Sequence, residues 1–83
     1  MELSDYRVQI DRIDRQLVEL FAQRMETAAG IAAYKKEHGL PVLDPIRERQ
    51  KLQNVVELAP ENMKAYTASL YTLLFELSRG YQN

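Results

Sequence analysis

The sequence has no cysteine, a single histidine and no excess of basic residues, and each shortage excludes a class of function. Without cysteine there is neither a disulfide framework nor a thiolate metal site, which fits a reducing cytoplasm. His38 alone cannot form a histidine cluster, so we expect no metal ion. Eleven basic against twelve acidic residues argue against nonspecific binding to nucleic acid or to an anionic membrane, because such binding usually needs a basic excess.

Long hydrophobic segments are missing as well. The polar beginning MELSDYRVQ does not predict a signal peptide, and no apolar run is long enough to cross a bilayer. Strand signals, internal repeats and low-complexity stretches are also absent. What remains is 46% hydrophobic and 28% charged, which is typical of an ordinary globular chain. We therefore predict one all-α domain over residues 1–83, with one long N-terminal helix and two shorter ones.

The long helix covers nearly the first half of the chain. Ser4 is the expected N-cap, no proline interrupts the helical pattern, and Gly39 is the expected C-cap after Glu37 or His38. Such a helix is about 50 Å long, whereas a compact chain of this size has a radius of gyration of about 12 Å. Because its own chain cannot cover it, we expect the helix to pack against a second chain.

A second helix is predicted from Asp44-Pro45 to about Leu58. Aspartate at the N-cap and proline at the first helical position are typical of a helix start. The linker and this helix are expected to turn their apolar side chains toward the core. These are Leu40, Val42, Leu43, Ile46, Leu52, Val55 and Val56.

A third helix is predicted to start near Pro60 or Glu61, after the break at Ala59-Pro60, and to fray or end at Gly80. Its apolar positions recur with helical period. They are Met63, Tyr66, Leu70, Leu73, Leu74 and Leu77.

One face of the long helix carries an apolar seam with a cation inside it. The seam follows a near-heptad spacing through Leu3, Ile10, Ile13, Leu17, Leu20 and Ile31. Arg24 occupies a seam position, seven residues after Leu17 and seven before Ile31. A guanidinium in an apolar seam is costly unless an anion or an acceptor meets it. A buried ion pair with a glutamate is the ordinary alternative to a ligand site.

Two further cations, Arg7 and Lys35, lie on the same helix. Arg7 and Arg24 are separated by about 25 Å along the helix, so they cannot hold one small molecule within a single chain. Arg24 and Lys35 are close to three turns apart and point the same way. An antiparallel dimer would bring Arg7 toward the partner's Arg24 and Lys35 and form two equivalent pockets. Taken singly, Arg7 could instead pair with Asp11, and Lys35 could complement the helix dipole.

Smaller polar groups lie at the ends of the shorter helices. Asp44, Arg47 and Glu48 share a face at the start of the second helix, and Ser78 and Gln82 are four residues apart at the end of the third. Each has an ordinary interpretation, as an N-cap, a dipole partner or a solvated hydroxyl.

The sequence resembles the all-α chorismate mutases in the run Arg7-x-x-Ile10-x-x-Ile13-Asp14-x-x-Leu17-x-x-Leu20-Phe21-x-x-Arg24. The resemblance continues in Ile31-Ala32-x-Tyr34-Lys35 and in Pro41-Val42-x-Asp44-x-x-Arg47-Glu48, without a gap. The third helix aligns through Leu70, Ser78 and Gln82. This resemblance implies an intertwined helical homodimer that converts chorismate to prephenate for phenylalanine and tyrosine synthesis, without a cofactor or metal.

The resemblance also assigns the cationic and amide side chains. Arg24 of one chain and Arg7 of its partner would clamp the two carboxylates of chorismate. Lys35 would reach a carboxylate and the ether oxygen, and Gln82 would donate a second hydrogen bond to that oxygen. The reaction is a one-substrate pericyclic rearrangement, so it needs orientation and fixed donors rather than a nucleophile.

The remaining wall of the pocket is assigned in the same way. Glu48 and the backbone near Asp44 would take the ring hydroxyl, while Arg47 and Ser78 would complete the polar wall. The catalytic set implied by the resemblance is Arg24, Lys35, Glu48 and Gln82.

Three alternatives remain open from the sequence. A pyruvate lyase acting on isochorismate would share the fold and the cation clamp, although Glu48 and Asp44 suit the hydroxyl of chorismate better. A dimeric helical module could bind the ligand without turnover. A DNA-binding domain is disfavoured by the balanced charge.

Overall fold

The computed structural model describes residues 1–82, which form three α-helices and one short 3-10 turn. Helix α1 spans Leu3–Glu37, α2 spans Pro45–Leu58, the turn η1 spans Glu61–Met63 and α3 spans Lys64–Gln82. No strand occurs in this part of the chain, so the prediction of an all-helical chain with three helices is confirmed. None of the described helices is both long enough and apolar enough to span a membrane.

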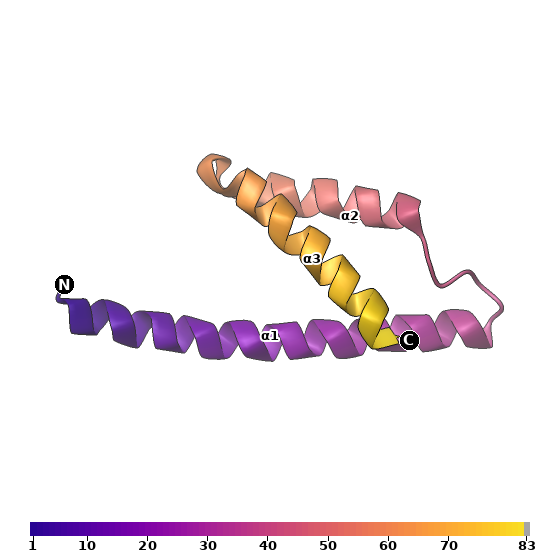
Figure 1. Cartoon of the computed structure of the whole chain (residues 1–83), viewed down its shortest axis with the longest axis horizontal. Helices are drawn as coiled ribbons and strands as arrows, with labels where there is room; N and C mark the ends of the chain where they lie inside the picture. The colour runs from indigo at the N-terminus through magenta and orange to yellow at the C-terminus, as the bar shows by residue number, and fades with distance from the viewer. Residues whose placement is uncertain (83) are drawn as a thin grey trace.

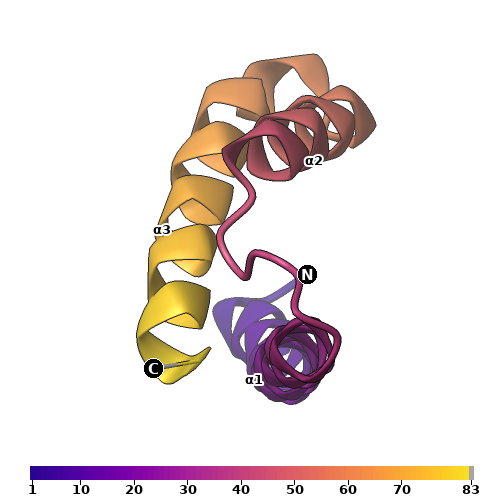
Figure 2. The ribbon, with the colours of Figure 1, turned by 90° about the vertical axis from the view of Figure 1, so that its right-hand side faces the viewer.

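The helices are arranged so that α3 joins the other two (Figure 1). α3 packs against both α1 and α2, whereas α1 and α2 do not approach each other closely within residues 1–82. Figure 2 shows α3 descending from α2 to α1, with the linker returning between those two helices. The N-terminal half of α1 extends beyond α3. The chain measures 55 × 25 × 16 Å with a radius of gyration of 15.9 Å, well above the about 12 Å of a compact chain this size.

The N-terminus of α1 differs from the sequence prediction. Ser4 lies inside the helix, and the N-cap is Glu2, whose N–H donates to Asp5 Oδ2 at 2.9 Å. Glu2 and Asp5 form a reciprocal capping box, which satisfies the free N–H groups without Ser4. The other end agrees with the prediction in that α1 ends at Glu37, but the C-cap is His38, and Gly39 follows it with a positive φ of 68°.

The C-terminus of α3 also differs from its prediction. The helix continues through Gly80 to Gln82 instead of fraying there. Two contacts with α1 hold the last turn: Tyr81 donates to Glu26, and Gln82 Nε2 donates to the carbonyl oxygen of Ala28 at 3.2 Å. These contacts offset the helix cost of glycine, about 1 kcal/mol relative to alanine.

The interior of the single chain is very small. Among residues 1–82 only Ala32 and Ser78 are buried. The predicted burial of Leu40, Leu43 and Ile46 is wrong, because α1 and α2 leave these side chains open to solvent. The prediction holds in part for Val42, Leu52, Val55 and Val56, which are half-buried. In the apolar stripe predicted for the third helix Leu74 is half-buried, and the other members are exposed: Met63, which lies in η1, and Tyr66, Leu70, Leu73 and Leu77 of α3.

Candidate active site

A pocket of about 200 Å³ opens where α1, the linker, α2 and the end of α3 meet. Seven of the eight predicted site residues line it, namely Arg24, Lys35, Asp44, Arg47, Glu48, Ser78 and Gln82. Its apolar lining comes from Ala28, Ile31, Val42 and Phe75. Residues from all three helices, up to 58 positions apart in the sequence, therefore converge on one small space.

Arg7 is the predicted residue that the chain does not bring to this pocket. It lines a separate depression near the start of α1, together with Tyr6, Gln9, Ile10 and Ile13. All of these residues belong to the N-terminal half of α1, the half that extends beyond α3 in Figure 1. Within one chain, Arg7 therefore contributes nothing to the pocket around Arg24.

Arg24 is held in place by neutral partners. Its Nη1 donates to Ser78 Oγ at 3.1 Å, and its guanidinium carbon lies 5.5 Å from the ring centre of Tyr71 and 5.7 Å from that of Phe75. The alternative of an ion pair with a glutamate is wrong, because within residues 1–82 no carboxylate lies within 4.0 Å of Arg24. The charge is thus fixed by cation–π contacts and remains available to an anion.

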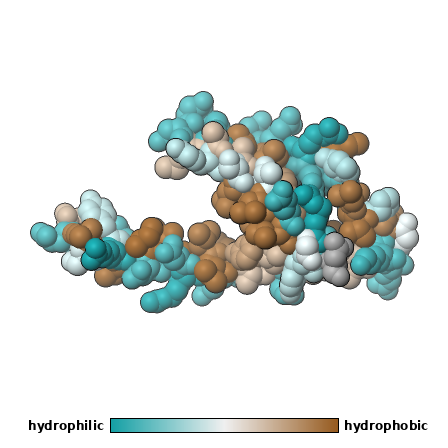
Figure 3. Space-filling model, viewed as in Figure 1, coloured by the Kyte–Doolittle hydropathy of each residue, from teal (hydrophilic) through white to brown (hydrophobic). Residues whose placement is uncertain are grey.

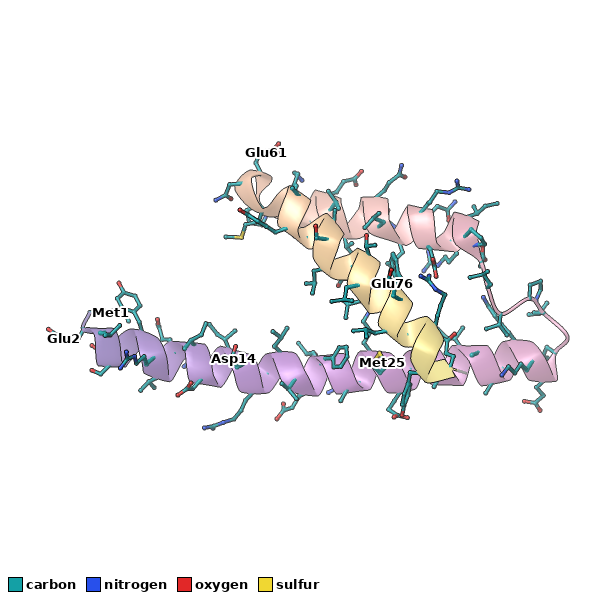
Figure 4. The ribbon with its side chains drawn as sticks, in the orientation of Figure 1. Met1, Glu2, Asp14, Met25, Glu61 and Glu76 are labelled. Atoms are coloured by element: carbon teal, nitrogen blue, oxygen red, sulfur yellow. The ribbon has the colours of Figure 1, made fainter. Side chains whose placement is uncertain are left out.

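Ser78 is buried rather than solvated, which excludes its ordinary interpretation. Its hydroxyl accepts from Arg24 and donates to Met25 Sδ at 3.7 Å. Figure 4 shows Met25 where α3 crosses α1. Ser78 therefore orients the guanidinium of Arg24 and also lines the pocket.

Lys35 and Arg47 present cations that the described residues leave free. Neither side chain makes a hydrogen bond or ion pair within residues 1–82. Lys35 is half-buried on the last turns of α1, and Arg47 follows Asp44 by three residues on α2. The side chain of Asp44 accepts the N–H of Arg47 at 3.0 Å, which confirms Asp44 as the N-cap of α2.

Glu48 has a partner that sequence reasoning missed. Arg79 Nη1 donates to both carboxylate oxygens of Glu48, at 2.8 and 2.7 Å, and the side chains of Arg79 and Glu48 are 41% and 32% exposed. Arg79 does not line the pocket. Its only sequence signal was a cation in the last turn of the third helix, which ordinarily indicates a dipole partner.

Gln82 lies on the pocket wall as a half-buried helical residue. One of its two amide hydrogens is used by the Ala28 carbonyl, which leaves the other for a ligand. The neighbouring Tyr81 donates to Glu26, and this hydrogen bond, together with the nearby carboxylate charge, raises the pKa of Tyr81 above its ordinary value.

Lys51 is a second residue that the sequence analysis overlooked. It is half-buried and lines the pocket one turn after Arg47 and Glu48. The offsets of four and three residues on one helix would have indicated the shared face. With Lys51 the pocket has four cations and two acids, so it favours an anionic ligand.

Among residues 1–82 no three His, Asp or Glu side chains converge as a metal site.

Comparisons with known proteins identify the family of the chain. The model of the family "Chorismate mutase type II" matches residues 6–83. The T-protein of Haemophilus influenzae is 45% identical over 51 residues, which are 61% of this chain and 14% of that protein. The chorismate mutase of Methanocaldococcus jannaschii is 33% identical over 61 residues, 74% of this chain and 62% of that protein.

A relative with a different printed substrate also matches. The 4-amino-4-deoxychorismate mutase of Streptomyces venezuelae is 35% identical over 46 residues, 55% of this chain and 45% of that protein. The chain thus spans less than two thirds of the length of each of these relatives. No solved structure matches it. Since the family model covers nearly all of its residues, including every residue of the pocket, the chain belongs to the chorismate mutase type II family.

Proposed function

We propose that this chain is a chorismate mutase, which rearranges chorismate to prephenate in phenylalanine and tyrosine synthesis. The observation that carries the proposal is the pocket itself. Arg24, Lys35 and Arg47 line it together with Glu48, Gln82 and a few apolar side chains. A dicarboxylate with one hydroxyl and one ether oxygen matches that set of partners group by group.

The rearrangement needs a substrate held in one conformation and positive groups placed near its oxygens, and the side chains of the pocket can supply both. Arg24 binds one carboxylate of the substrate with its planar guanidinium, whose orientation Ser78 and two aromatic rings already fix. Holding both carboxylates, one on the ring and one on the flexible side chain, favours the chair-like conformer in which the bond-forming carbons approach each other.

The ether oxygen gains negative charge as its C–O bond breaks. The ammonium of Lys35 and the free amide hydrogen of Gln82 are the donors proposed for that oxygen, since both groups line the pocket. Donors that are fixed before the reaction stabilise the transition state without reorganisation. The carboxylate of Glu48 and the backbone near Asp44 accept the ring hydroxyl, and Arg47 and Ser78 complete the wall.

The second carboxylate is assigned to Arg7 of a partner chain, in an antiparallel homodimer with shared pockets. Two features support this assembly. The apolar seam of α1 is open to solvent, with Ile13, Leu17 and Leu20 exposed by 49%, 57% and 61%. A largely apolar groove of about 440 Å³ lies between α1 and α3, and Figure 3 shows hydrophobic side chains gathered where these helices cross.

A second copy of α1 would fill this groove and cover the seam. The N-terminal half of α1, which carries Arg7, extends beyond α3 and is left uncovered by its own chain, which supports the proposal that it lies against a partner. We also propose a cytoplasmic location, since the cysteine-free chain needs no oxidising compartment.

The proposal is tested by incubating the purified protein with chorismate and identifying the product. We expect prephenate, with no pyruvate released. Conversion of isochorismate to salicylate and pyruvate, with chorismate left intact, would establish the lyase instead. Binding of chorismate without conversion would identify a non-catalytic module.

The Streptomyces venezuelae relative is named for a second substrate, 4-amino-4-deoxychorismate, in which an amine replaces the ring hydroxyl. We assign chorismate to this chain in preference to the amine, because Glu48, the proposed partner of that group, is already paired with a cation.

A further inference from the structure

We propose that Arg79 is a specificity-determining positioning residue, which makes the pocket select a neutral ring hydroxyl over a ring ammonium by holding Glu48 from outside. The inference rests on the proposed function, since it concerns the group that Glu48 meets on the substrate. Nothing in the motif by which the sequence resembles its family involves Arg79.

Glu48 lies between two cavities. One is the candidate active site, and the other is a cleft of about 280 Å³ between α2 and α3 that Glu48, Arg49 and Arg79 line together with Leu52 and Phe75. Of these two cavities, Arg79 lines only the second. Arg79 therefore meets the carboxylate of Glu48 from the second cleft and does not line the active site.

The contact fixes the carboxylate and balances its charge. One nitrogen of Arg79 donates to both oxygens of Glu48, at 2.8 and 2.7 Å, which restrains rotation of the carboxylate. Within residues 1–82, Arg79 is the only cation within 4.0 Å of Glu48. Each carboxylate oxygen keeps a lone pair, so Glu48 can still accept one hydrogen bond from the pocket side.

Glu48, when paired with Arg79, is expected to bind the hydroxyl of chorismate and the ammonium of 4-amino-4-deoxychorismate with different affinity. A hydroxyl needs only an acceptor, which the paired Glu48 provides. An amine is protonated at neutral pH, and an ammonium bound to Glu48 would share that carboxylate with the Arg79 guanidinium, where the two like charges repel in a partly enclosed site. Removing Arg79 leaves an unbalanced carboxylate that favours the ammonium.

The cations that line the active site are less suited to a test of this distinction. Because Arg24, Lys35, Arg47 and Lys51 line the active site itself, replacing any of them would also change the binding of the anionic substrate. Arg79 pairs with Glu48 and does not line the active site.

The test compares kcat/KM for chorismate and for 4-amino-4-deoxychorismate in the wild type and in Arg79→Met. We expect the wild type to prefer chorismate, and Arg79→Met to shift the ratio toward the amine by at least about tenfold. The ratio of two substrates on one preparation does not depend on the folded fraction, so a merely structural role of Arg79 would leave it unchanged.

Two control variants complete the design. Arg49→Met removes an exposed cation from the same cleft without touching Glu48, and Arg79→Lys keeps the charge; both should hold the wild-type ratio within about threefold. An active wild type whose ratio does not change in Arg79→Met overturns this inference alone. A wild type that converts neither substrate overturns the proposed function and this inference with it.

Discussion

Arg24→Ala is expected to lower kcat/KM for chorismate by roughly a thousandfold or more, about 4 kcal/mol of transition-state stabilisation. The orientation of the guanidinium is fixed in advance by Ser78 Oγ at 3.1 Å and by the rings of Tyr71 and Phe75. Alanine leaves a substrate carboxylate facing apolar side chains without a partner. The loss should appear in steady-state rates at saturating and at limiting chorismate.

The same variant should stay folded and associated. It loses one hydrogen bond and two cation–π contacts at a partly buried site, which we expect to cost about 1 kcal/mol of stability. Circular dichroism and sedimentation velocity would measure this. Arg15→Ala is the matched control, because Arg15 is exposed on the opposite face of α1 and should leave the rate unchanged. A near-wild-type rate for Arg24→Ala would rule out the clamp.

Lys35→Met is expected to reduce kcat by roughly a hundred- to a thousandfold, the usual cost of removing one donor from a developing negative charge. Methionine keeps much of the length of the side chain and its tendency to form a helix, so the effect isolates the ammonium. Because the charge on the ether oxygen develops only in the transition state, kcat should fall by a larger factor than KM rises.

Lys36→Met provides the comparison for Lys35. It removes an exposed ammonium from the adjacent position on α1, outside the pocket, and should change kcat by less than about twofold. If Lys35→Met behaves like Lys36→Met, the ether oxygen is stabilised by another group, and the assignment of Lys35 is wrong.

The predictable parts of this fold are those set by neighbouring residues. Asp44-Pro45 was sufficient to place the start of α2, because an N-cap and a first-turn proline act within four residues. The start of α1 differs from its prediction, because the reciprocal bonds between Glu2 and Asp5 cap the helix two residues before Ser4. The extension of α3 through Gly80 depends on contacts with α1, more than fifty residues away.

The site follows the same division. Spacing alone indicated that Arg24 and Lys35 share a face, and the geometry of α1 explains why Arg7 lies elsewhere. Ser78 and Gln82 could be placed only through the family resemblance, because helical spacing says nothing about which helix they face. The pair of Glu48 and Arg79 joins two helices across 31 residues, so no local pattern predicts it.

We propose that Arg7 of a second chain completes each pocket, and mixing two inactive variants tests this directly. Arg7→Ala and Arg24→Ala proteins, each inactive by itself, are mixed in equal amounts, allowed to exchange subunits, and assayed for prephenate formed from chorismate. Half of the dimers are then mixed, and each has one pocket with both arginines, so we predict recovery of about a quarter of the wild-type activity. Absence of recovery after exchange has been verified by mass spectrometry would contradict the shared site.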